Sequence, residues 1–486
     1  MDVRLSPSAL GGTVAAVSSK SDVHRALIAA ACADRPCRIK SNICSKDMEA
    51  SMRCLNALGA KLSYEEEEQA FSVVPVQHSV GQEAQNPETK TADGKATEQL
   101  SDRQSETERV LDCAESGSTL RFLIPVAAAL GGTSRFIGHG RLPERPVGVL
   151  LDAMTPHGVH ADSDHLPLCI KGKLSGGDFL LPGNISSQFV TGLLLAFPLL
   201  AGRSRLKLST ELESRAYVDM TLDTMQRFGC PVTALQDGYA WQPPVQRGQS
   251  AYLAPKIYEA DGDWSNAAFF LAADALNVLY HGEKARGSVC VTGLRERSVQ
   301  GDRKIAEVLN ALIAYVSSQR TGSMRGCVDE AGEGRKGKAS ETGAVCSTVQ
   351  EHGVLCFAAD VSEIPDLAPI LSVVMALAPC GHFQITNAAR LRLKECDRLS
   401  AMADALGALS AKVTELPDGL LIEGSGRPQG GVRLRGYNDH RVVMALSIAA
   451  AYCTEPVSIT DAEAVRKSYP DFFRDYRVIG GLFDGI

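Results

Sequence analysis

Basic and hydroxyl side chains recur in short polar clusters along this sequence. Lys20 and Ser21 precede Arg25, which would lie one helical turn beyond Ser21 on the same face. A second cluster, Glu115 to Arg121, contains Gly117, where the missing side chain allows a ligand to approach the backbone closely. Guanidinium forks, ammonium groups and helix N-termini can replace the hydration shells of phosphates and carboxylates. The sequence therefore predicts a site for small anionic ligands.

Further polar clusters follow in both halves of the chain. They are Arg141 to Pro146, Ser186 to Gln188, Ser214 with Tyr217, Ile364 to Asp366, Lys394 to Arg398, Asn438 to Arg441, and Lys467 to Asp471. Taken alone, the run from Lys394 to Arg398 is typical of a solvated helix face. Asp366, which follows a proline, is by itself typical of a helix N-cap. The recurrence of such clusters at the starts of similar helices favours one composite site.

Six short polar clusters, five of them among those named above, open helices that are rich in small apolar residues on all sides. These helices are expected to begin near Ser21, Gly117, Ser186, Trp264, Asp366 and Asn438. A helix that is apolar all round lies inside a domain, with only its ends near solvent. Once two polar segments are set aside, the helices recur at a period of roughly 65 to 80 residues, which indicates a repeated supersecondary unit. We expect two domains of three units, with the helix N-termini forming an anion-binding cleft between them.

Several units carry a second, amphipathic helix that ends at a glycine. These glycines are Gly59, Gly229 and Gly407, and strand-like sequence follows each. Glycine is the commonest residue just after a helix, because it adopts the left-handed conformation without strain. The sequence therefore predicts that all three glycines terminate their helices.

Two segments, 77–109 and 317–351, differ in composition from the rest and are expected to be flexible surface insertions. The second contains Gly332, Gly334 and Gly337 in a GxGxxG pattern. A phosphate-binding loop of this kind requires a preceding strand and a following helix, and neither pattern flanks it. The sequence therefore argues against a nucleotide site in this segment.

Composition excludes several classes of protein. The 486 residues are 44% hydrophobic and 22% charged, with a net charge of −7, which disfavours general nucleic-acid binding. The 14 cysteines form no CxxC pair, and His157, His160 and His165 fit no ligand pattern, so neither a metal nor a cofactor is expected. The apolar run 189–202 is too short to span a bilayer, and no secretory signal is visible, so we expect a cytoplasmic protein without membrane contact.

The ordered clusters resemble those of the 5-enolpyruvylshikimate-3-phosphate synthase family from Val3 to the C-terminal region, outside the two insertions. The resemblance implies an inside-out α/β barrel fold of two domains, each with three βαβαββ repeats around buried parallel helices. The expected domains are 1–18 plus 259–486, and 19–258. It also implies transfer of the enolpyruvyl group of phosphoenolpyruvate to the 5-hydroxyl of shikimate 3-phosphate. Phosphate would leave through a tetrahedral intermediate, in chorismate and aromatic amino-acid synthesis.

The resemblance assigns roles to individual residues. For shikimate 3-phosphate it implies Lys20, Ser21, Arg25, Ser186, Ser187, Gln188, Ser214, Tyr217, Asp366 and Lys394. For phosphoenolpyruvate it implies Lys20, Gly117, Arg145, Gln188, Arg398, Arg441 and Lys467, with Arg121 supporting the same pocket. Asp366 fits the general base and Glu395 the general acid, and Lys20 and Lys467 would stabilise charge or handle protons. The family resemblance favours a monomer without cofactor.

The sequence departs from the family pattern at two positions of the expected site. Glu115 and Arg390 stand where many members have asparagine. Two alternative functions stay open on sequence alone. One is a related UDP-N-acetylglucosamine enolpyruvyl transferase, although Lys20 and Ser21 differ from the Lys-Asn of that pattern. The other is a catalytically silent anion-binding protein on the same fold, against which the joint presence of Lys20, Asp366 and Glu395 argues.

The basic residues of the expected site fall into two sets along the chain. Lys20, Arg25, Arg121 and Arg145 belong to the first three units, and Lys394, Arg398, Arg441 and Lys467 to the last three. Repulsion between the sets would favour an open arrangement of the domains, and anionic substrates would favour closure.

Overall fold

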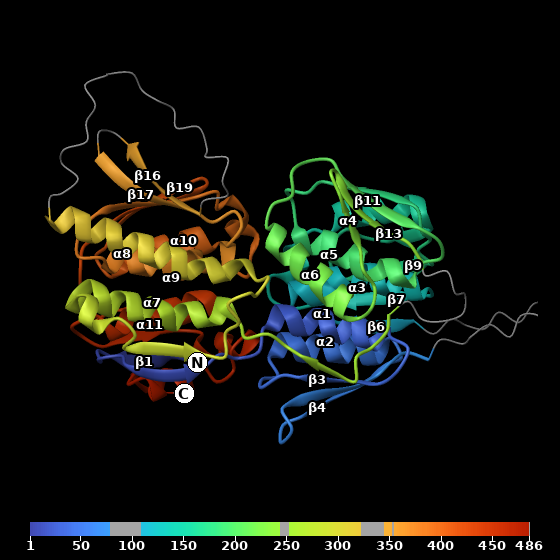
Figure 1. The fold of residues 1–486 in the computed structure, drawn as a ribbon, viewed down its shortest axis with the longest axis horizontal. Coiled ribbons are helices and arrows are strands. Elements are labelled where there is room, and N and C mark those ends of the chain that lie inside the picture. The colour runs from blue at the N-terminus through green and yellow to red at the C-terminus, as the bar shows by residue number, and fades with distance from the viewer. Residues whose placement is uncertain (78–107, 244–251, 322–344, 352–353, 486) are drawn as a thin grey trace, which may run out of the picture.

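The chain folds into two lobes that lie side by side (Figure 1). The computed structural model describes residues 1–77, 108–243, 252–321, 345–351 and 354–485. We call the lobe that contains β3 to β14 the N-terminal lobe, and the lobe that contains β1, β2 and everything after β14 the C-terminal lobe. Each lobe carries three β-sheets in the described part of the chain. The whole is a two-domain inside-out α/β barrel, with helices enclosed by sheets.

The N-terminal lobe has three four-stranded sheets. The first contains β14 (Ile257–Glu259), β3 (Cys37–Lys40), β5 (Ala70–Val74) and β4 (Lys61–Glu65). The second contains β6 (Arg109–Asp112), β7 (Ser134–Ile137), β9 (Leu168–Gly172) and β8 (Val159–Ala161). The third contains β10 (Asp178–Leu181), β11 (Ser204–Leu208), β13 (Gly238–Trp241) and β12 (Thr233–Leu235). In each, one parallel pair is followed by two antiparallel pairs, so the repeat expected from the sequence is confirmed here.

Two of the three sheets in the C-terminal lobe contain this pattern, one of them with β16 added at its edge, and the third is a single parallel pair. Its sheets contain β21 (Arg433–Leu434), β22 (Val457–Ile459), β1 (Val3–Ser6) and β23 (Leu482–Asp484); β15 (Val289–Thr292) and β2 (Gly12–Ala15); and β16 (Cys346–Glu351), β17 (Val354–Asp360), β18 (His382–Thr386), β20 (Gly419–Glu423) and β19 (Lys412–Leu416). The first two strands of the chain therefore pair with strands formed by its second half.

Six helices fill the interiors of the two lobes. They are α1 (Lys20–Ala31), α3 (Gly117–Leu130), α5 (Ser187–Ala196), α7 (Trp264–His281), α9 (Ala368–Leu377) and α11 (His440–Ala451). Every residue of α9 and α11 is buried, as expected for helices that are apolar on all sides. The starts match the six predicted positions to within two residues. Polar caps define several of these starts; for example, Ser116 Oγ accepts a hydrogen bond from the backbone N–H of Thr119 at 3.2 Å.

A second, less buried set of helices accompanies the first. It contains α2 (Lys46–Ala57), α4 (Gly148–Met154), α6 (Arg215–Arg227), α8 (Ile305–Thr321), α10 (Arg398–Ala408) and α12 (Phe472–Val478). Short 3-10 helices are η1 (Leu142–Glu144), η2 (Thr155–His157), η3 (Phe197–Leu199), η4 (Glu283–Ala285), η5 (Gly301–Lys304), η6 (Pro365–Leu367), η7 (Ala389–Leu393) and η8 (Ala462–Lys467). No helix in the described ranges is long and apolar enough to cross a membrane.

The chain passes between the lobes at two neighbouring points. Ser19 N donates to Asp261 O at 2.7 Å, and Asp263 N donates to Val17 O at 2.7 Å. Ser18 and Gly262 form an isolated antiparallel bridge at the same place. The two connections therefore support each other, and the cores lie on either side of them.

The predicted insertions need correction at their boundaries. Helix α8 continues to Thr321, and β16 (Cys346–Glu351) pairs antiparallel with β17, so 317–321 and 346–351 are regular structure. Strand β16 is the edge of its sheet and exposes Ser347 and Thr348, which explains why composition alone suggested a loop. Arg109 likewise opens β6. The remainder of both segments, 78–107 and 322–344, including the GxGxxG pattern, lies outside the described residues.

The glycine prediction holds at two of its three positions. Gly59 and Gly229 follow α2 and α6 with φ of 102° and 71°. Gly407 was expected to end its helix but lies inside α10, and Ser410, with φ of 66°, follows that helix instead. The helix continues because the N–H of Leu409 still finds the carbonyl of Ala405 at 3.2 Å.

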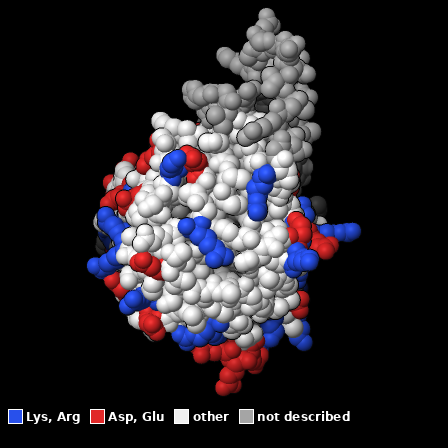
Figure 2. All heavy atoms as spheres, turned by 90° about the vertical axis from the view of Figure 1, so that its left-hand side faces the viewer, with Lys and Arg blue, Asp and Glu red and all other residues white. Residues whose placement is uncertain are grey.

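On the exposed end of the C-terminal lobe, charges of both signs are interspersed. Figure 2 views that end and shows Lys and Arg scattered among Asp and Glu, without one continuous basic patch on this face. A nucleic-acid interface would require such a patch.

Candidate active site

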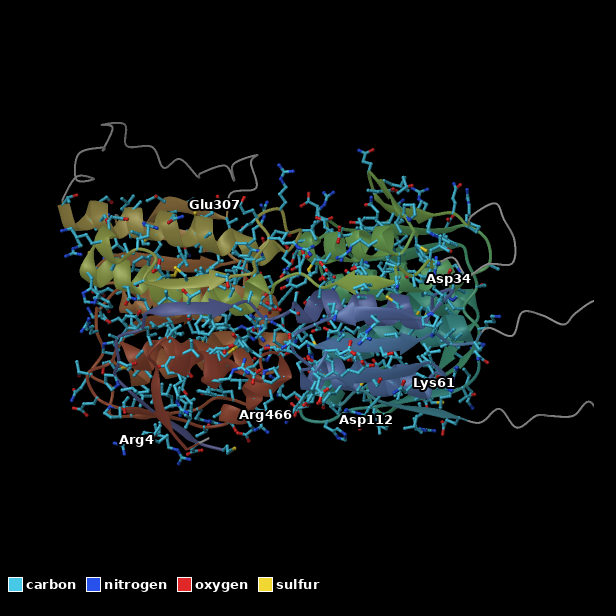
Figure 3. The ribbon with its side chains drawn as sticks, turned by 60° about the horizontal axis from the view of Figure 1, so that its bottom comes forward. Arg4, Asp34, Lys61, Asp112, Glu307 and Arg466 are labelled. Atoms are coloured by element: carbon cyan, nitrogen blue, oxygen red, sulfur yellow. The ribbon has the colours of Figure 1, made fainter. Side chains whose placement is uncertain are left out.

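The N-termini of the buried helices meet at a cavity of about 210 Å³ between the lobes. Lys20 of α1, Gly117 of α3, Ser187 of α5 and His440 of α11 all line it, as does Asp263, which caps α7. The predicted cleft at the helix N-termini is therefore present. Labelled surface charges such as Asp34 and Lys61 lie away from this boundary (Figure 3).

Most of the residues predicted from the sequence line this one cavity. They are Lys20, Ser21, Arg25, Gly117, Arg121, Arg145, Ser186, Ser187, Gln188, Ser214, Tyr217, Asp366, Lys394, Glu395, Arg398 and Arg441. Lys467 does not line the cavity but lies nearby, as described below. Arg390, one of the two departures from the family pattern, also contributes to the lining.

Two buried guanidinium groups converge on Gly117. A Cβ atom added to Gly117 would lie 2.7 Å from Nη1 of Arg121 and 2.7 Å from Nη1 of Arg145, so only glycine leaves room for both. Burial lowers the pKa of both arginines, and their mutual repulsion lowers that of Arg121 further. Their buried Nε atoms have no hydrogen-bond partner within the described residues. Such a cation pair favours a bound anion, which would satisfy these groups and remove the repulsion.

Arg25 is another buried cation that lines the cavity. Several contacts hold its guanidinium group in place. Its Nε donates to Thr221 Oγ1 at 2.8 Å and its Nη2 to the carbonyl of Tyr217 at 2.8 Å. The guanidinium also lies 5.1 Å from the ring centroid of Phe122. Burial lowers its pKa to about 10, which leaves the group charged at neutral pH. Arg25 is thus oriented by neutral partners and keeps its charge available for a ligand.

Arg398 is the centre of the acidic side of the cavity. Its side chain is 2% exposed. Nη1 donates to Asp366 Oδ1 at 2.8 Å, Nη2 to Glu395 Oε2 at 2.9 Å, and Nε to Asp439 Oδ2 at 2.8 Å. One buried cation therefore fixes the positions of three carboxylates.

Asp366 has further partners from both lobes. Tyr217 of α6 donates its hydroxyl to Asp366 Oδ2 at 3.1 Å, and Nη2 of Arg441 lies 3.5 Å from the same oxygen. Burial alone would raise the pKa of Asp366, but Lys394, Arg441 and Arg398 hold it well below its ordinary range. The carboxylate is therefore ionised and able to accept a proton.

Glu395 is held ionised as well. Burial opposes the charge, but Arg398, Arg145, His440 and Lys394 keep the pKa of Glu395 well below its ordinary value. The sequence had suggested opposite protonation states for Asp366 and Glu395. The structure instead indicates that both carboxylates are ionised, because Arg398 contacts both of them.

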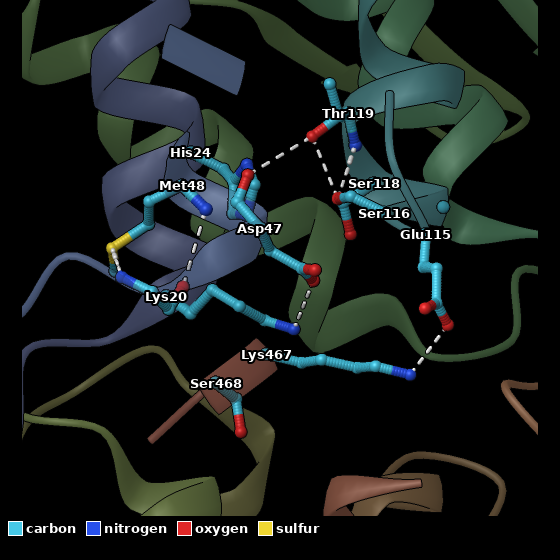
Figure 4. Close-up of polar contacts among 12 residues, drawn as sticks. Lys20, His24, Asp47, Met48, Glu115, Ser116, Ser118, Thr119, Lys467 and Ser468 are labelled. Atoms are coloured by element: carbon cyan, nitrogen blue, oxygen red, sulfur yellow. Dashed lines mark hydrogen bonds and ion pairs between the residues drawn. The ribbon is translucent and has the colours of Figure 1, made fainter. Parts of the chain in front are cut away.

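Lys20 opens α1 at the boundary between the lobes. Its Nζ contacts Asp47 Oδ2 at 2.9 Å, and its backbone N–H donates to Asp263 Oδ2 at 3.1 Å. Burial alone would lower the pKa of Lys20, but Asp47 and Glu395 raise it above its ordinary value. The ammonium group is therefore charged, and Figure 4 shows it directed at Asp47, which lines the same cavity.

Lys467 lies at the end of η8 and is 7% exposed. Its Nζ contacts Glu115 Oε2 at 2.7 Å and the carbonyl of Asn438 at 2.6 Å. Figure 4 shows Lys467 extended toward Glu115, on the same side as Lys20. The other departure, Arg390, contacts Glu213 Oε2 at 2.7 Å and the carbonyl of Ser362 at 2.7 Å.

The sequence did not assign Asp47, Asp263 and Asp439, which hold Lys20 and Arg398 in place. Asp263 and Asp439 both cap helices, accepting from the backbone N–H groups of Asn266 and Arg441 at 2.8 Å. A capping aspartate next to a site cation was the signal that could have identified them. Within the described residues, no group of three His, Cys, Asp or Glu side chains is placed to hold a metal ion.

Comparison with known proteins supports one family. The sequence profile of EPSP synthase (3-phosphoshikimate 1-carboxyvinyltransferase) matches residues 5–94 and 79–476. The chain is 35% identical over 485 residues to the 3-phosphoshikimate 1-carboxyvinyltransferase of Clostridium novyi (strain NT), with 99% of this chain and 98% of the relative covered. The corresponding protein of Clostridium acetobutylicum is 37% identical over 482 residues, with 99% and 97% covered.

Solved structures share the fold at lower identity. EPSP synthase from Acinetobacter baumannii gives a TM-score of 0.68 at 20% identity, with both chains covered completely. The enolpyruvyl transferase NikO from Streptomyces tendae gives 0.65 at 15% identity, covering 99% of this chain and 98% of that one. The fold and the cation-lined cavity thus define the class of two-lobed enolpyruvyl transferases. Within that class, the full-length sequence matches show that the chain belongs to the EPSP synthase family.

Proposed function

We propose that this cavity carries out the family reaction, transfer of the enolpyruvyl group of phosphoenolpyruvate to the 5-hydroxyl of shikimate 3-phosphate. The single observation that carries the proposal is the arrangement at Arg398. Its buried guanidinium holds Asp366 and Glu395 opposite the buried arginines of the N-terminal lobe. Two carboxylates and a set of cationic groups thus surround one cavity.

The two substrates would occupy different parts of this cavity. Shikimate 3-phosphate would contact Lys20, Ser21, Arg25, Ser186, Ser187, Gln188, Ser214, Tyr217, Asp366 and Lys394. Phosphoenolpyruvate would contact Lys20, Gly117, Arg145, Gln188, Arg398, Arg441 and Lys467. The Nε atoms of Arg121 and Arg145 near Gly117, which have no hydrogen-bond partner among the described residues, support placing the anionic donor there. Arg25 and Tyr217, which lie together on α1 and α6, support placing the acceptor at the other side.

Asp366 would act as the general base. Its carboxylate is ionised, and it would take the proton of the 5-hydroxyl as that oxygen attacks C2 of the donor. The methylene carbon of the donor gains a proton, and a tetrahedral ketal phosphate forms. Reversal of the proton transfer at the methyl group then expels phosphate and restores the double bond in the product.

Glu395 would supply the proton to the methylene carbon, although the structure keeps it ionised. The donor brings a phosphate and a carboxylate next to Arg145, Arg398 and Lys394, the cations that lower the pKa of Glu395. Those added negative charges offset the cations and raise the pKa of Glu395. Donor binding would therefore prepare the acid. Lys20 and Lys467 would stabilise the charges of the intermediate.

The direct test is turnover by the purified full chain. With shikimate 3-phosphate and phosphoenolpyruvate together, we expect stoichiometric phosphate release and a product whose mass equals acceptor plus enolpyruvyl. Replacing the acceptor by UDP-N-acetylglucosamine should give no release. Release only with the nucleotide sugar, or with neither acceptor, would refute the proposal. We further propose that the enzyme is a cytoplasmic monomer, built of domains 1–18 plus 259–486 and 19–258; sedimentation at active concentrations tests the monomer.

A further inference from the structure

Glu115 and Lys467 form an ion pair that joins the two lobes. Glu115 precedes α3 in the N-terminal lobe, and Lys467 ends η8 in the C-terminal lobe. Their charged atoms lie 2.7 Å apart (Figure 4). Nδ2 of Asn438 also donates to Glu115 Oε2 at 2.9 Å. One carboxylate oxygen thus accepts from two groups of the opposite lobe.

The side chain of Glu115 reaches Lys467 by passing close to the backbone of Gly140. Gly140 has φ of 57°, and a Cβ atom added there would lie 2.8 Å from Glu115 Oε2. A larger residue at position 140 would require the Glu115 carboxylate to shift. The small size of Gly140 therefore leaves room for the contact between Glu115 and Lys467.

We infer that Glu115 is a positioning residue that sets the affinity for the donor through Lys467, an inference that rests on the proposed role of Lys467 in binding phosphoenolpyruvate. An ammonium group has three N–H donors. Glu115 and the Asn438 carbonyl engage Nζ of Lys467, which leaves one donor for a ligand. Glu115 also neutralises the charge of Lys467. The donor therefore meets a weaker cation and a nearby negative charge.

The same pair acts on the arrangement of the lobes. An asparagine at position 115 would carry no charge, whereas the carboxylate attracts Lys467 across the boundary whether or not a donor is bound. Glu115 therefore supplies part of the attraction between the lobes. With a neutral residue at position 115, that part would come only from the bound anionic donor. By itself this attraction would favour the closed arrangement and so donor binding. Weaker donor binding is expected because the neutralised charge and occupied N–H groups of Lys467 outweigh it.

The second departure from the family pattern has the same geometry. Arg390 of the C-terminal lobe contacts Glu213 of the N-terminal lobe, also at 2.7 Å. Both positions where an asparagine was expected thus carry a charged residue with a partner in the opposite lobe. Because the Arg390 pair does not involve Lys467, it provides a matched control for Glu115.

The test compares Glu115→Gln with Glu213→Gln in the full chain. Each substitution removes one charge from an ion pair between the lobes and preserves the size of the side chain. For Glu115→Gln we expect the KM for phosphoenolpyruvate and the inhibition constant of inorganic phosphate to fall by about three- to tenfold. The KM for shikimate 3-phosphate should stay within twofold of wild type. Glu213→Gln should leave the KM for phosphoenolpyruvate within twofold.

An unchanged or raised donor KM in Glu115→Gln would overturn the inference. Equal falls in donor KM for both variants would also overturn it, because they would reflect the lobe contact alone. Glu115→Asn serves as a second variant should the glutamine fold poorly, with the same expected direction. Turnover by the wild-type protein distinguishes the proposed function from the role of Glu115. If turnover is absent, the proposed function is refuted. If turnover is normal and the donor KM of the variants is unchanged, only the role of Glu115 is refuted.

Discussion

The guanidinium of Arg398 lies 2.8 Å from the carboxylate of Asp366, and the same group contacts Glu395 and Asp439. The assigned base and the assigned acid are therefore not independent, because one buried cation sets the charge and position of both. A change at Arg398 must alter protonation, geometry and stability together.

Arg398→Met should destabilise the folded protein strongly. Removing one partner of a buried charge cluster leaves carboxylates without compensation, which costs about 3–5 kcal/mol. Urea unfolding at neutral pH measures the loss. Lys412→Met is the control, since Lys412 pairs with Glu423 at 3.0 Å on the surface, and it should cost at most about 1 kcal/mol. Equal losses for the two variants would contradict the central role of Arg398.

Asp366→Asn and Glu395→Gln should fold but lose turnover. Each removes a proton-transfer group while keeping its shape, so the rate of phosphate release should fall by at least about a hundredfold. Glu423→Gln, a change at the exposed pair with Lys412, should retain the wild-type rate. A rate near wild type in Asp366→Asn or Glu395→Gln would remove that residue from its assigned role.

Gly117→Ala should weaken donor binding selectively. The new methyl group would lie 2.7 Å from Nη1 of both Arg121 and Arg145, so both guanidinium groups must shift away from the donor position. The KM for phosphoenolpyruvate should rise by about tenfold or more, since charged hydrogen bonds contribute about 1.5–3 kcal/mol each. The KM for shikimate 3-phosphate, measured in parallel, should change little. A proportional rise in both would indicate general disruption.

Asp302 should make the folded state less stable as pH rises. Burial, with repulsion from Asp366, raises the pKa of Asp302 from 3.8 to about 7, although Arg441 and a hydrogen bond from Ser265 oppose the shift. The folded state therefore keeps a proton that the unfolded state releases, and stability falls from pH 3.8 to about 7.

Asp302→Asn removes this titration. The free energy of unfolding of Asp302→Asn, relative to wild type, should rise across that pH window and level off above it. Urea titrations at several pH values measure the difference. A difference that is constant with pH would show that Asp302 is ionised in the folded protein throughout.

Substrate binding should bring the lobes closer. Lys20, Arg25, Arg121 and Arg145 line the same cavity as Lys394, Arg398 and Arg441. Anions between these sets neutralise both and favour closure. Small-angle scattering should give a smaller radius of gyration with shikimate 3-phosphate plus glyphosate than without ligand. An unchanged radius at saturation would mean that closure is independent of substrate.

The sequence predicted the helical interior well, for a physical reason. Helices such as α9 and α11 are apolar on every side and, at 10 and 12 residues, too short to cross a bilayer, so burial in a domain is the environment that fits them. Strand β16 was missed because an edge strand exposes polar side chains, which in composition resemble a loop. The end of α10 was misplaced because glycine is tolerated within a helix when neighbouring hydrogen bonds continue.

The sequence identified the cations of the site better than the carboxylates that pair with them. Arginines and lysines at helix openings form a pattern that is visible along the chain. Asp47, Asp263 and Asp439 are paired with cations distant in sequence, and only folding brings them together. The ionisation of Glu395 depends on the same proximity, since Arg145 and His440 come from separate elements.

Strand β1 is synthesised long before its neighbours β22 and β23, which are formed by residues 457–459 and 482–484. At ordinary translation speeds the interval between them is tens of seconds. During that time the N-terminal lobe can complete its sheets, since β3 to β14 lie within one continuous stretch. Val3 and Leu5 are fully buried in the folded protein, and during this interval they stay exposed. The two lobes therefore mature in sequence, and the emerging chain offers an unpaired hydrophobic strand to chaperones until β22 and β23 are made.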